Sequence, residues 1–178
     1  MLINKSPLIG LTRHANYLGH YPDAIRQQAQ SLINQNKLSE YLLNKYPVAH
    51  NISSAKALYD YTLEIKNTYL RKSNPLSKVI YDDKIHAIQH ALGLHTYVSR
   101  VQGNKLRAKQ EIRVASTFKR TPEECLRMIV VHELAHLREK EHNKAFYKLC
   151  QHMEPNYHQL ELDLRLYLTH MELQGSLY

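Results

Sequence analysis

The sequence predicts an α+β fold in which a small antiparallel sheet lies beside a central helix, with further helices before and after them. Three observations predict it. Apolar residues recur at helical spacing over residues 22–75 and again after Pro155. Two runs typical of strands flank Gln102-Gly103-Asn104, as in a β-hairpin. The pentad His132-Glu133-Leu134-Ala135-His136 falls in a run without glycine or proline, which favours a helix.

The length and composition set the broad class of the protein. With 178 residues we expect a single domain over 1–178, mainly helical over 1–75, with the sheet and the remaining helices in 76–178. Only 2 cysteines, at unrelated spacing, favour a reducing compartment over a disulfide scaffold. We find no signal peptide at the N-terminus and no run approaching the ~20 apolar residues of a membrane span. We therefore expect a cytoplasmic protein with no membrane partner.

The formal net charge of +8 indicates attraction to an anionic partner, such as a nucleotide, a nucleic acid or an acidic protein. A basic but passive surface would give the same charge. Binding of nucleic acid is compatible with the charge, but the sequence contains no motif for it. It gives no indication of the oligomeric state.

The first elements of the chain are predicted to be helices. Residues 22–46 have a helical apolar pattern, which Pro47 ends. Ser53 or Ser54 can cap a long amphipathic helix that stops at Asn74-Pro75. Residues 78–81 look extended, and residues 85–92 could form either a strand or a short helix.

Residues 96–101 and 105–115 are the arms of the expected hairpin. In the second arm Leu106, Ala108, Ile112 and Val114 point one way, while the other face carries Glu111 and four basic residues, Lys105, Arg107, Lys109 and Arg113. A strand that precedes a metal-binding helix often borders the substrate cleft, so these four residues are candidate contacts for an anionic substrate. Alternatively they form a solvated face whose charge discourages edge pairing.

The helix that carries the pentad has a recognisable start. We expect Thr121 to be its N-cap, Pro122 its first helical residue, and Glu124 the partner in a capping box. Cys125, Ile129, His132 and His136 then follow one stripe. Both Cys125 and Cys150 are interpreted as small buried apolar residues rather than as ligands.

The histidines predict a zinc site. Because His132 and His136 are four residues apart on a helix, they lie on the same face and can share one metal ion. His142, six residues later, is the expected third ligand. The longer signature with this spacing has glycine where this chain has Glu139, so the chain must leave the helix by another route. Three imidazoles leave a fourth position for water, as in a catalytic zinc site.

Glu133 can reach a metal-bound water without occupying a coordination position, which suits the general base of a zinc hydrolase. With 12 histidines in the chain, the alternative is chance spacing of ordinary residues. A structural zinc site would favour four protein ligands, commonly including cysteine. Candidate donors for the developing negative charge, which the sequence does not rank, are Arg107, Lys109, Arg113, Tyr157 and His158.

The last elements are two more helices. Asn143 can cap a helix with an apolar face that ends before Pro155. A closing amphipathic helix spans Leu160 to Met171, and we expect residues 175–178 to be a frayed tail.

Two runs, SRVQGNKLRAKQEIRVAS and VVHELAHLREKEHNKAFYKLCQHMEP, closely resemble the YgjP-like family of small bacterial zincin-type proteins. The resemblance covers roughly residues 57–167. It implies a minimal zincin-like fold, zinc ligation by His132, His136 and His142, and Glu133 as the catalytic carboxylate. This chain departs from the family at Gln102-Gly103, where many members have a tryptophan-glycine pair; it has no tryptophan.

The resemblance implies two kinds of substrate. The family name indicates a metallopeptidase, and SprT-like proteases that act near DNA are a related analogy. The YgjP type is also described as a pyrophosphatase that converts UTP to UMP and diphosphate. A third interpretation, a nucleic-acid-binding protein with a vestigial zinc site, would need stacking platforms such as some of the 13 tyrosines.

Overall fold

The computed structural model describes residues 17–85, 94–102 and 105–178, and only the backbone of 94–102 and 105–109. Its elements, in chain order, confirm the α+β class. They are α1 (Asp23–Asn34), α2 (Leu38–Lys45), α3 (Ala55–Tyr69), β1 (Leu76–Asp82), β2 (Leu94–Gln102), β3 (Lys105–Ala115), a 3₁₀ turn (Ser116–Arg120), α4 (Glu123–Ala135), α5 (Lys144–Met153) and α6 (Tyr157–Gln174).

The three strands form a mixed sheet in the order β1-β3-β2. β2 and β3 pair antiparallel from Leu94↔Arg113 to Gln102↔Lys105, which confirms the hairpin. Its turn, residues 103–104, lies outside the described residues. The expected all-antiparallel sheet was wrong, because β1 pairs parallel with β3, from Leu76↔Gln110 to Asp82↔Ala115. Periodicity shows that residues 78–81 are extended, but it cannot show which later strand they join.

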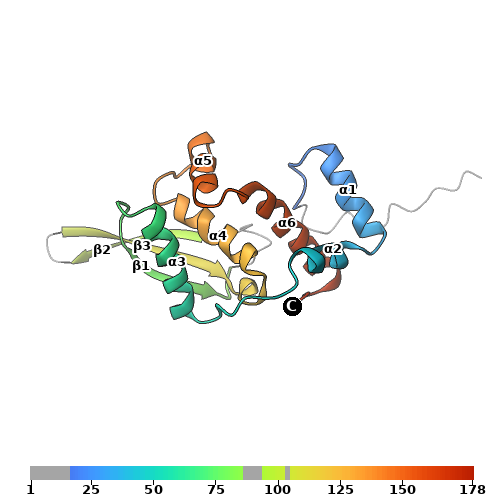
Figure 1. The fold of residues 1–178 in the computed structure, drawn as a ribbon. Coiled ribbons are helices and arrows are strands. Elements are labelled where there is room, and N and C mark those ends of the chain that lie inside the picture. The colour runs from blue at the N-terminus through green and yellow to red at the C-terminus, as the bar shows by residue number, and fades with distance from the viewer. Residues whose placement is uncertain (1–16, 86–93, 103–104) are drawn as a thin grey trace, which may run out of the picture.

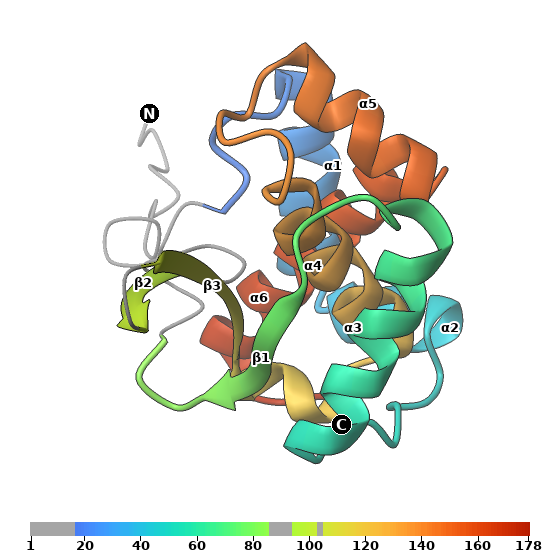
Figure 2. The same ribbon diagram turned by 90° about the vertical axis from the view of Figure 1, so that its left-hand side faces the viewer.

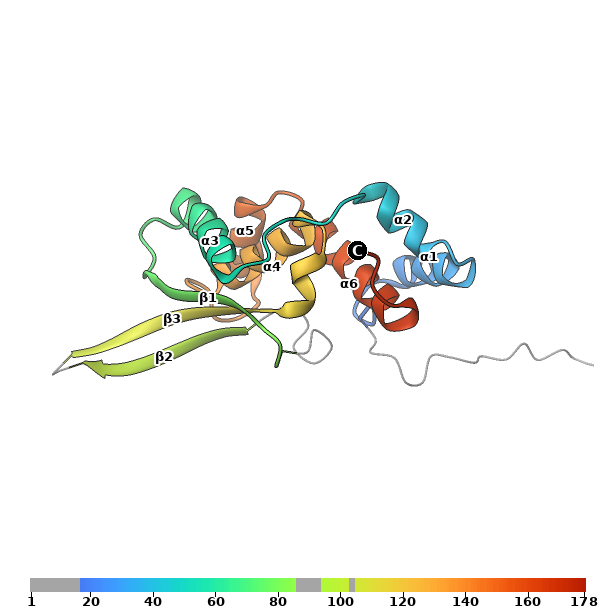
Figure 3. The same ribbon diagram turned by 90° about the horizontal axis from the view of Figure 1, so that it is seen from below.

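The helices cover one face of the sheet. Figure 3 shows α3, α4 and α5 on the same side of the strands, with α3 along β1. α1 and α2 lie at the opposite end of the molecule from the hairpin, beside α6 (Figure 1). No helix among the described residues is long and apolar enough to cross a membrane.

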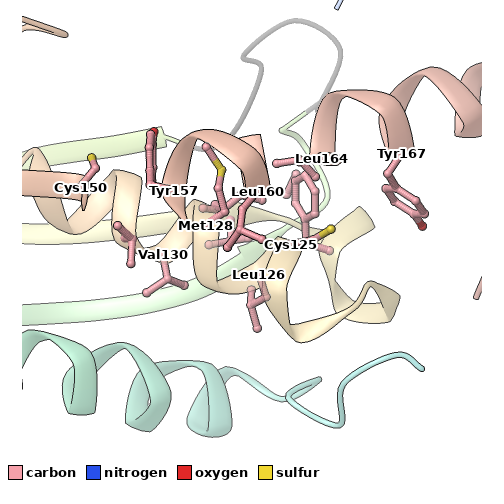
Figure 4. Close-up of a cluster of buried hydrophobic side chains, with 14 of the residues drawn as sticks. Cys125, Leu126, Met128, Val130, Cys150, Tyr157, Leu160, Leu164 and Tyr167 are labelled. Carbon is pink, nitrogen blue, oxygen red and sulfur yellow. The ribbon is translucent and has the colours of Figure 1, made fainter. Parts of the chain in front are cut away.

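Helix α4 is the centre of the core. In Figure 2 it lies in the middle of the molecule, surrounded by the sheet and by α3, α5 and α6. Every residue from Met128 to Ala135 is buried, so burial goes well beyond the single stripe that periodicity predicts. A helix that is buried all round belongs to the interior of a domain. Side chains from α4, α5 and α6, including Cys125 and Cys150, meet in this core (Figure 4).

The helix caps test the sequence predictions directly. The side chains of Ser54 and Asn143 accept hydrogen bonds from the backbone N–H groups of Ala57 and Phe146, so both N-caps are confirmed. The cap predicted at Thr121 was wrong. The Thr121 hydroxyl donates instead to the carbonyl of Phe118, 3.2 Å away, and thus closes the preceding 3₁₀ turn.

Helix α4 therefore starts one residue later than predicted. Pro122 is its N-cap rather than its first helical residue, and no side chain makes a capping hydrogen bond there, so Glu124 does not complete a capping box. Pro122 suits the boundary because it has no N–H group that would need a partner.

The C-terminal tail was predicted to be frayed, and this was also wrong. The hydroxyl of Tyr178 donates to the carbonyl of Tyr46, and its ring packs against Tyr167 on α6. The tail thereby lies against the helical end of the molecule.

The helical pattern over residues 22–46 is divided into α1 and α2 at Asn36, which has a positive φ of 55°. α2 is fixed to α6 through Asp163, which is 1% exposed. The Asp163 carboxylate accepts hydrogen bonds from Tyr41, Tyr46, Lys45 and Gln159. Four donors around one buried carboxylate satisfy it almost fully, as a buried charge requires.

Candidate metal centre

Three elements bring the three predicted histidines together. His132 lies in the last turn of α4, His136 is the residue that ends this helix, and His142 lies in the loop before α5. Nε2 of His142 is 3.1 Å from Nε2 of His132 and 3.1 Å from Nε2 of His136. The sequence spacing therefore produces one cluster of imidazoles.

The loop between His136 and His142 folds back without a glycine. The N–H of Glu139 donates to the carbonyl of Ala135, so the chain makes one further turn as it leaves α4. Among the described non-glycine residues only Asn36 has a positive φ. Glu139, at the glycine position of the longer signature, thus needs no left-handed conformation, and its side chain causes no backbone strain.

The separations of the imidazole nitrogens fit a metal ion. A tetrahedral ion with metal–nitrogen bonds of about 2.0–2.1 Å holds its ligand atoms about 3.3–3.4 Å apart. Hydrogen bonds do not account for both contacts of His142, because one imidazole nitrogen carries either a single proton or a single lone pair. The three side chains could instead hold a metal ion between their Nε2 atoms.

The other ring nitrogens have partners that favour this arrangement. Nδ1 of His136 is 3.0 Å from the carbonyl oxygen of Glu139, which can only accept, so Nδ1 donates and the lone pair is on Nε2. Nδ1 of His132 is 2.7 Å from the hydroxyl oxygen of Tyr157. Partners of this kind orient metal-binding histidines in proteins.

Burial favours the neutral form of His132 and of His136. It lowers the pKa of His132 to about 3, with smaller contributions from the nearby His136, His142 and Arg165. Burial also lowers the pKa of His136. Since a metal binds the neutral imidazole, the protein disfavours the protonated forms that would compete with it.

The apolar ring of Phe146 packs against all three imidazoles. Its ring is fully buried, and its centroid is 4.9 Å from the His132 ring and 4.7 Å from each of the other two. The sequence predicted an apolar face on this helix but gave no sign of this contact. Because His132 is buried and His142 is exposed, the cluster faces solvent on the His142 side.

Glu133, the next residue after His132 on α4, is a buried carboxylate. It is 2% exposed, and burial raises its pKa to about 8. Its Oε2 atom has no hydrogen-bond partner within the part of the chain that the structure describes. A buried polar atom without a partner calls for a specific explanation, and a catalytic role is one.

The residues predicted to contact an anionic substrate or the developing negative charge lie in different surroundings. The guanidinium of Arg113 is 2.7 Å from Asp82 and 2.9 Å from Glu111, so it already forms ion pairs with two carboxylates. Lys105, Arg107 and Lys109 lie on β3, but their side chains are outside the described residues. His158 is exposed, with its ring 5.6 Å from that of Tyr147. Tyr157 is fully buried, so its hydroxyl contacts the imidazole of His132 and not the open side of the cluster.

Comparison with known proteins places the chain in a family. Residues 80–167 match the family model described as YgjP-like, metallopeptidase domain. The chain is also 59% identical over 157 residues to the UTP pyrophosphatase of Escherichia coli (strain K12), an alignment that covers 88% of this chain and 94% of that protein. This chain belongs to the YgjP-like family. No solved structure gave a significant match.

Membership of the YgjP-like family confirms the resemblance found in the sequence and, with it, an enzyme of the metallohydrolase class. The matched region runs from the end of β1 to α6 and includes all three histidines and Glu133. The fold elements that build the metal centre are thus those that the family shares.

Proposed function

We propose that this protein is a zinc-dependent hydrolase that cleaves UTP to UMP and diphosphate. The observation that carries the hydrolase part is the cluster of three Nε2 atoms next in sequence to a buried carboxylate oxygen without a described partner. Zinc is the ion we favour, because three neutral imidazoles with one position left open are typical of catalytic zinc sites. The substrate is proposed from the relative that is 59% identical over almost its full length and is named a UTP pyrophosphatase.

The residues of the chain have separate parts in the proposed reaction. His132, His136 and His142 would hold the zinc ion, which when bound lowers the pKa of water and polarises a phosphoryl oxygen. Glu133 takes a proton from the attacking water as the water oxygen forms its bond to phosphorus. The bond between the α- and β-phosphates breaks, and Glu133 returns the proton to the products. One water is consumed, and UMP and diphosphate leave.

The basic face of β3 is the proposed phosphate contact. Lys105, Arg107 and Lys109 occupy alternate positions along β3, the spacing of residues that share one face of a strand. A triphosphate carries several negative charges close together, which cations at this spacing can match. Arg113 belongs to the same face, but its contacts with Asp82 and Glu111 make it a weaker candidate than the other three.

A peptidase is the second candidate, because the matched family model is described as a metallopeptidase domain. β2 is the last strand on its side of the described sheet, so its outer edge could pair with an extended peptide. The two candidates predict different substrates for the same metal centre.

A substrate panel tests the proposal. Purified protein would be incubated with UTP, CTP, ATP, GTP and casein, before and after zinc is removed by a chelator and restored. We expect diphosphate release from UTP that is lost on chelation and recovered with zinc. Zinc-dependent cleavage of casein, with no turnover of any nucleotide, would contradict the proposal and favour the peptidase.

A further inference from the structure

A short series of aromatic rings begins at the metal centre. The rings belong to His142 in the loop before α5, to Tyr147 on α5 and to His158 on α6. The centroid of the Tyr147 ring is 6.4 Å from that of His142 and 5.6 Å from that of His158. We call these three side chains the aromatic strip. Of the three, the proposed reaction uses only His142.

The aromatic strip is accessible to solvent. His142 and His158 are exposed, and Tyr147 is half-buried. Phe146, the neighbour of Tyr147 on α5, is instead fully buried, and its ring is nearly perpendicular to that of Tyr147, at 89°. Since Phe146 packs against all three imidazoles, α5 places one ring against the metal centre and the next ring beside it, partly in solvent.

A planar ring beside a metal centre suits a substrate that carries both phosphates and a planar group. UTP, the substrate in the name of the similar Escherichia coli protein, joins uracil through ribose to its phosphates. A phosphate held at the metal centre therefore brings the base within a few ångströms of it. The phosphates need cations, whereas the base needs a flat apolar surface, because every nucleobase has a π-face that stacks on aromatic side chains.

We propose that the aromatic strip is the base-binding subsite of the nucleotide, with the uracil ring stacked on Tyr147 beside His158. The inference rests on the proposed hydrolysis of UTP. It gives a place to the part of the substrate that neither the zinc ion nor the basic face of β3 would hold.

The surroundings of Tyr147 suit this part. Its ring packs against Phe146 and lies 6.4 Å from the ring of the fully buried Tyr157, so neighbours from α5 and α6 hold it in place. A ring that is already held loses little conformational entropy when a ligand binds to it. If Tyr147 served only to pack α5 on α6, its removal would lower stability but would not distinguish a ligand with a base from one without.

The test compares Tyr147→Ala and Tyr147→Phe with Tyr69→Ala. Tyr69 on α3 is also half-buried beside an exposed histidine, with its ring 5.5 Å from that of His152, so it is a matched control. Zinc-loaded protein would be titrated in a calorimeter with a UTP analogue whose α- and β-phosphates are joined by a methylene group, which prevents hydrolysis. A parallel titration would use inorganic triphosphate, which lacks the base. Zinc content would be checked after each titration.

We expect Tyr147→Ala to bind the UTP analogue about 5- to 100-fold more weakly than the wild type, the usual effect of removing a stacking ring. Its affinity for inorganic triphosphate should stay within about twofold of the wild type, because stacking involves only the base. Tyr147→Phe keeps the ring and should bind the analogue within about threefold of the wild type. Tyr69→Ala should match the wild type with both ligands.

A second readout uses the wild type alone. With the analogue bound, nuclear Overhauser effects should connect the uracil ring protons to the ring of Tyr147. Their absence, or equal affinity of Tyr147→Ala and the wild type for the analogue, would overturn the inference and leave the nucleotide hydrolase standing. An equal loss of affinity for the analogue and for triphosphate would also overturn it. If the wild type bound neither ligand, the proposed function would fail and the inference with it.

Discussion

Nε2 of His142 lies 3.1 Å from Nε2 of His132, although ten residues separate them in the chain. The turn after α4 and the start of α5 produce this approach, because His142 sits in the short loop that joins the two helices. His142 is also the most exposed of the three histidines. Its substitution should therefore change metal binding with little effect on the core.

His142→Ala should lose zinc without unfolding. We expect zinc affinity to fall by more than the ~100-fold that the loss of a second-sphere partner can cost, because a ligand is removed outright. Elemental analysis after dialysis would measure the zinc content, and circular dichroism the fold. His152→Ala, an exposed histidine on α5, is the control and should keep its zinc. Equal zinc in both variants would remove His142 from the ligand set.

Asn143→Ala should couple stability to metal binding. The Asn143 side chain caps α5 directly after His142, so its loss should lower the free energy of unfolding by about 0.5–2 kcal/mol and weaken zinc binding. Ser54→Ala removes the same kind of cap from α3, far along the chain from the histidines. It should cost similar stability in urea unfolding but leave zinc affinity unchanged. Similar zinc affinities of the two variants would show that the cap has no influence on the site.

Features that depend on neighbouring residues could be predicted from the sequence. The caps at Ser54 and Asn143, the hairpin arms and the convergence of the histidines all follow from spacing within about twenty residues. The parallel pairing of β1 with β3 could not be predicted, because Leu76 and Gln110 are distant in sequence. The same holds for Tyr178, which contacts the carbonyl of Tyr46 across the molecule.

The candidate site also combines features that depend on nearby residues with features that depend on distant ones. Its ligand residues lie in one short motif, whereas Tyr157 and Phe146 reach the imidazoles only through the packing of α5 and α6 on α4. At Thr121 a local rule gave the wrong result, because a threonine hydroxyl can serve the preceding turn as readily as the following helix.

Asp163→Asn should destabilise the contact between α2 and α6. The neutral amide leaves Lys45 without its carboxylate and offers a donor where Tyr46 needs an acceptor. We expect a loss of about 1–3 kcal/mol in urea unfolding. Asp60→Asn, which removes the carboxylate from the exposed pair with Lys56, should stay within about 0.5 kcal/mol of the wild type. A comparable effect of both substitutions would contradict the special role of the buried carboxylate.

Arg107→Ala and Lys109→Ala should impair turnover of UTP. Cations that face the phosphates would stabilise the departing diphosphate as well as bind the substrate, so both kcat and 1/KM should fall. The binding part should also weaken with added salt. Lys56→Ala, an exposed cation on α3, is the matched control. If the strand variants behave as Lys56→Ala does at low salt, β3 is not the phosphate contact.

Glu133→Gln tests the central claim most directly. The amide has almost the same size as the carboxylate and remains beside His132, but it cannot take a proton from water. Zinc content and UTP turnover would be measured on the same samples of wild type and variant. We predict about one zinc per chain in both and a loss of turnover of about 10²-fold or more in the variant. Full zinc occupancy with turnover within a few-fold of the wild type would contradict the account.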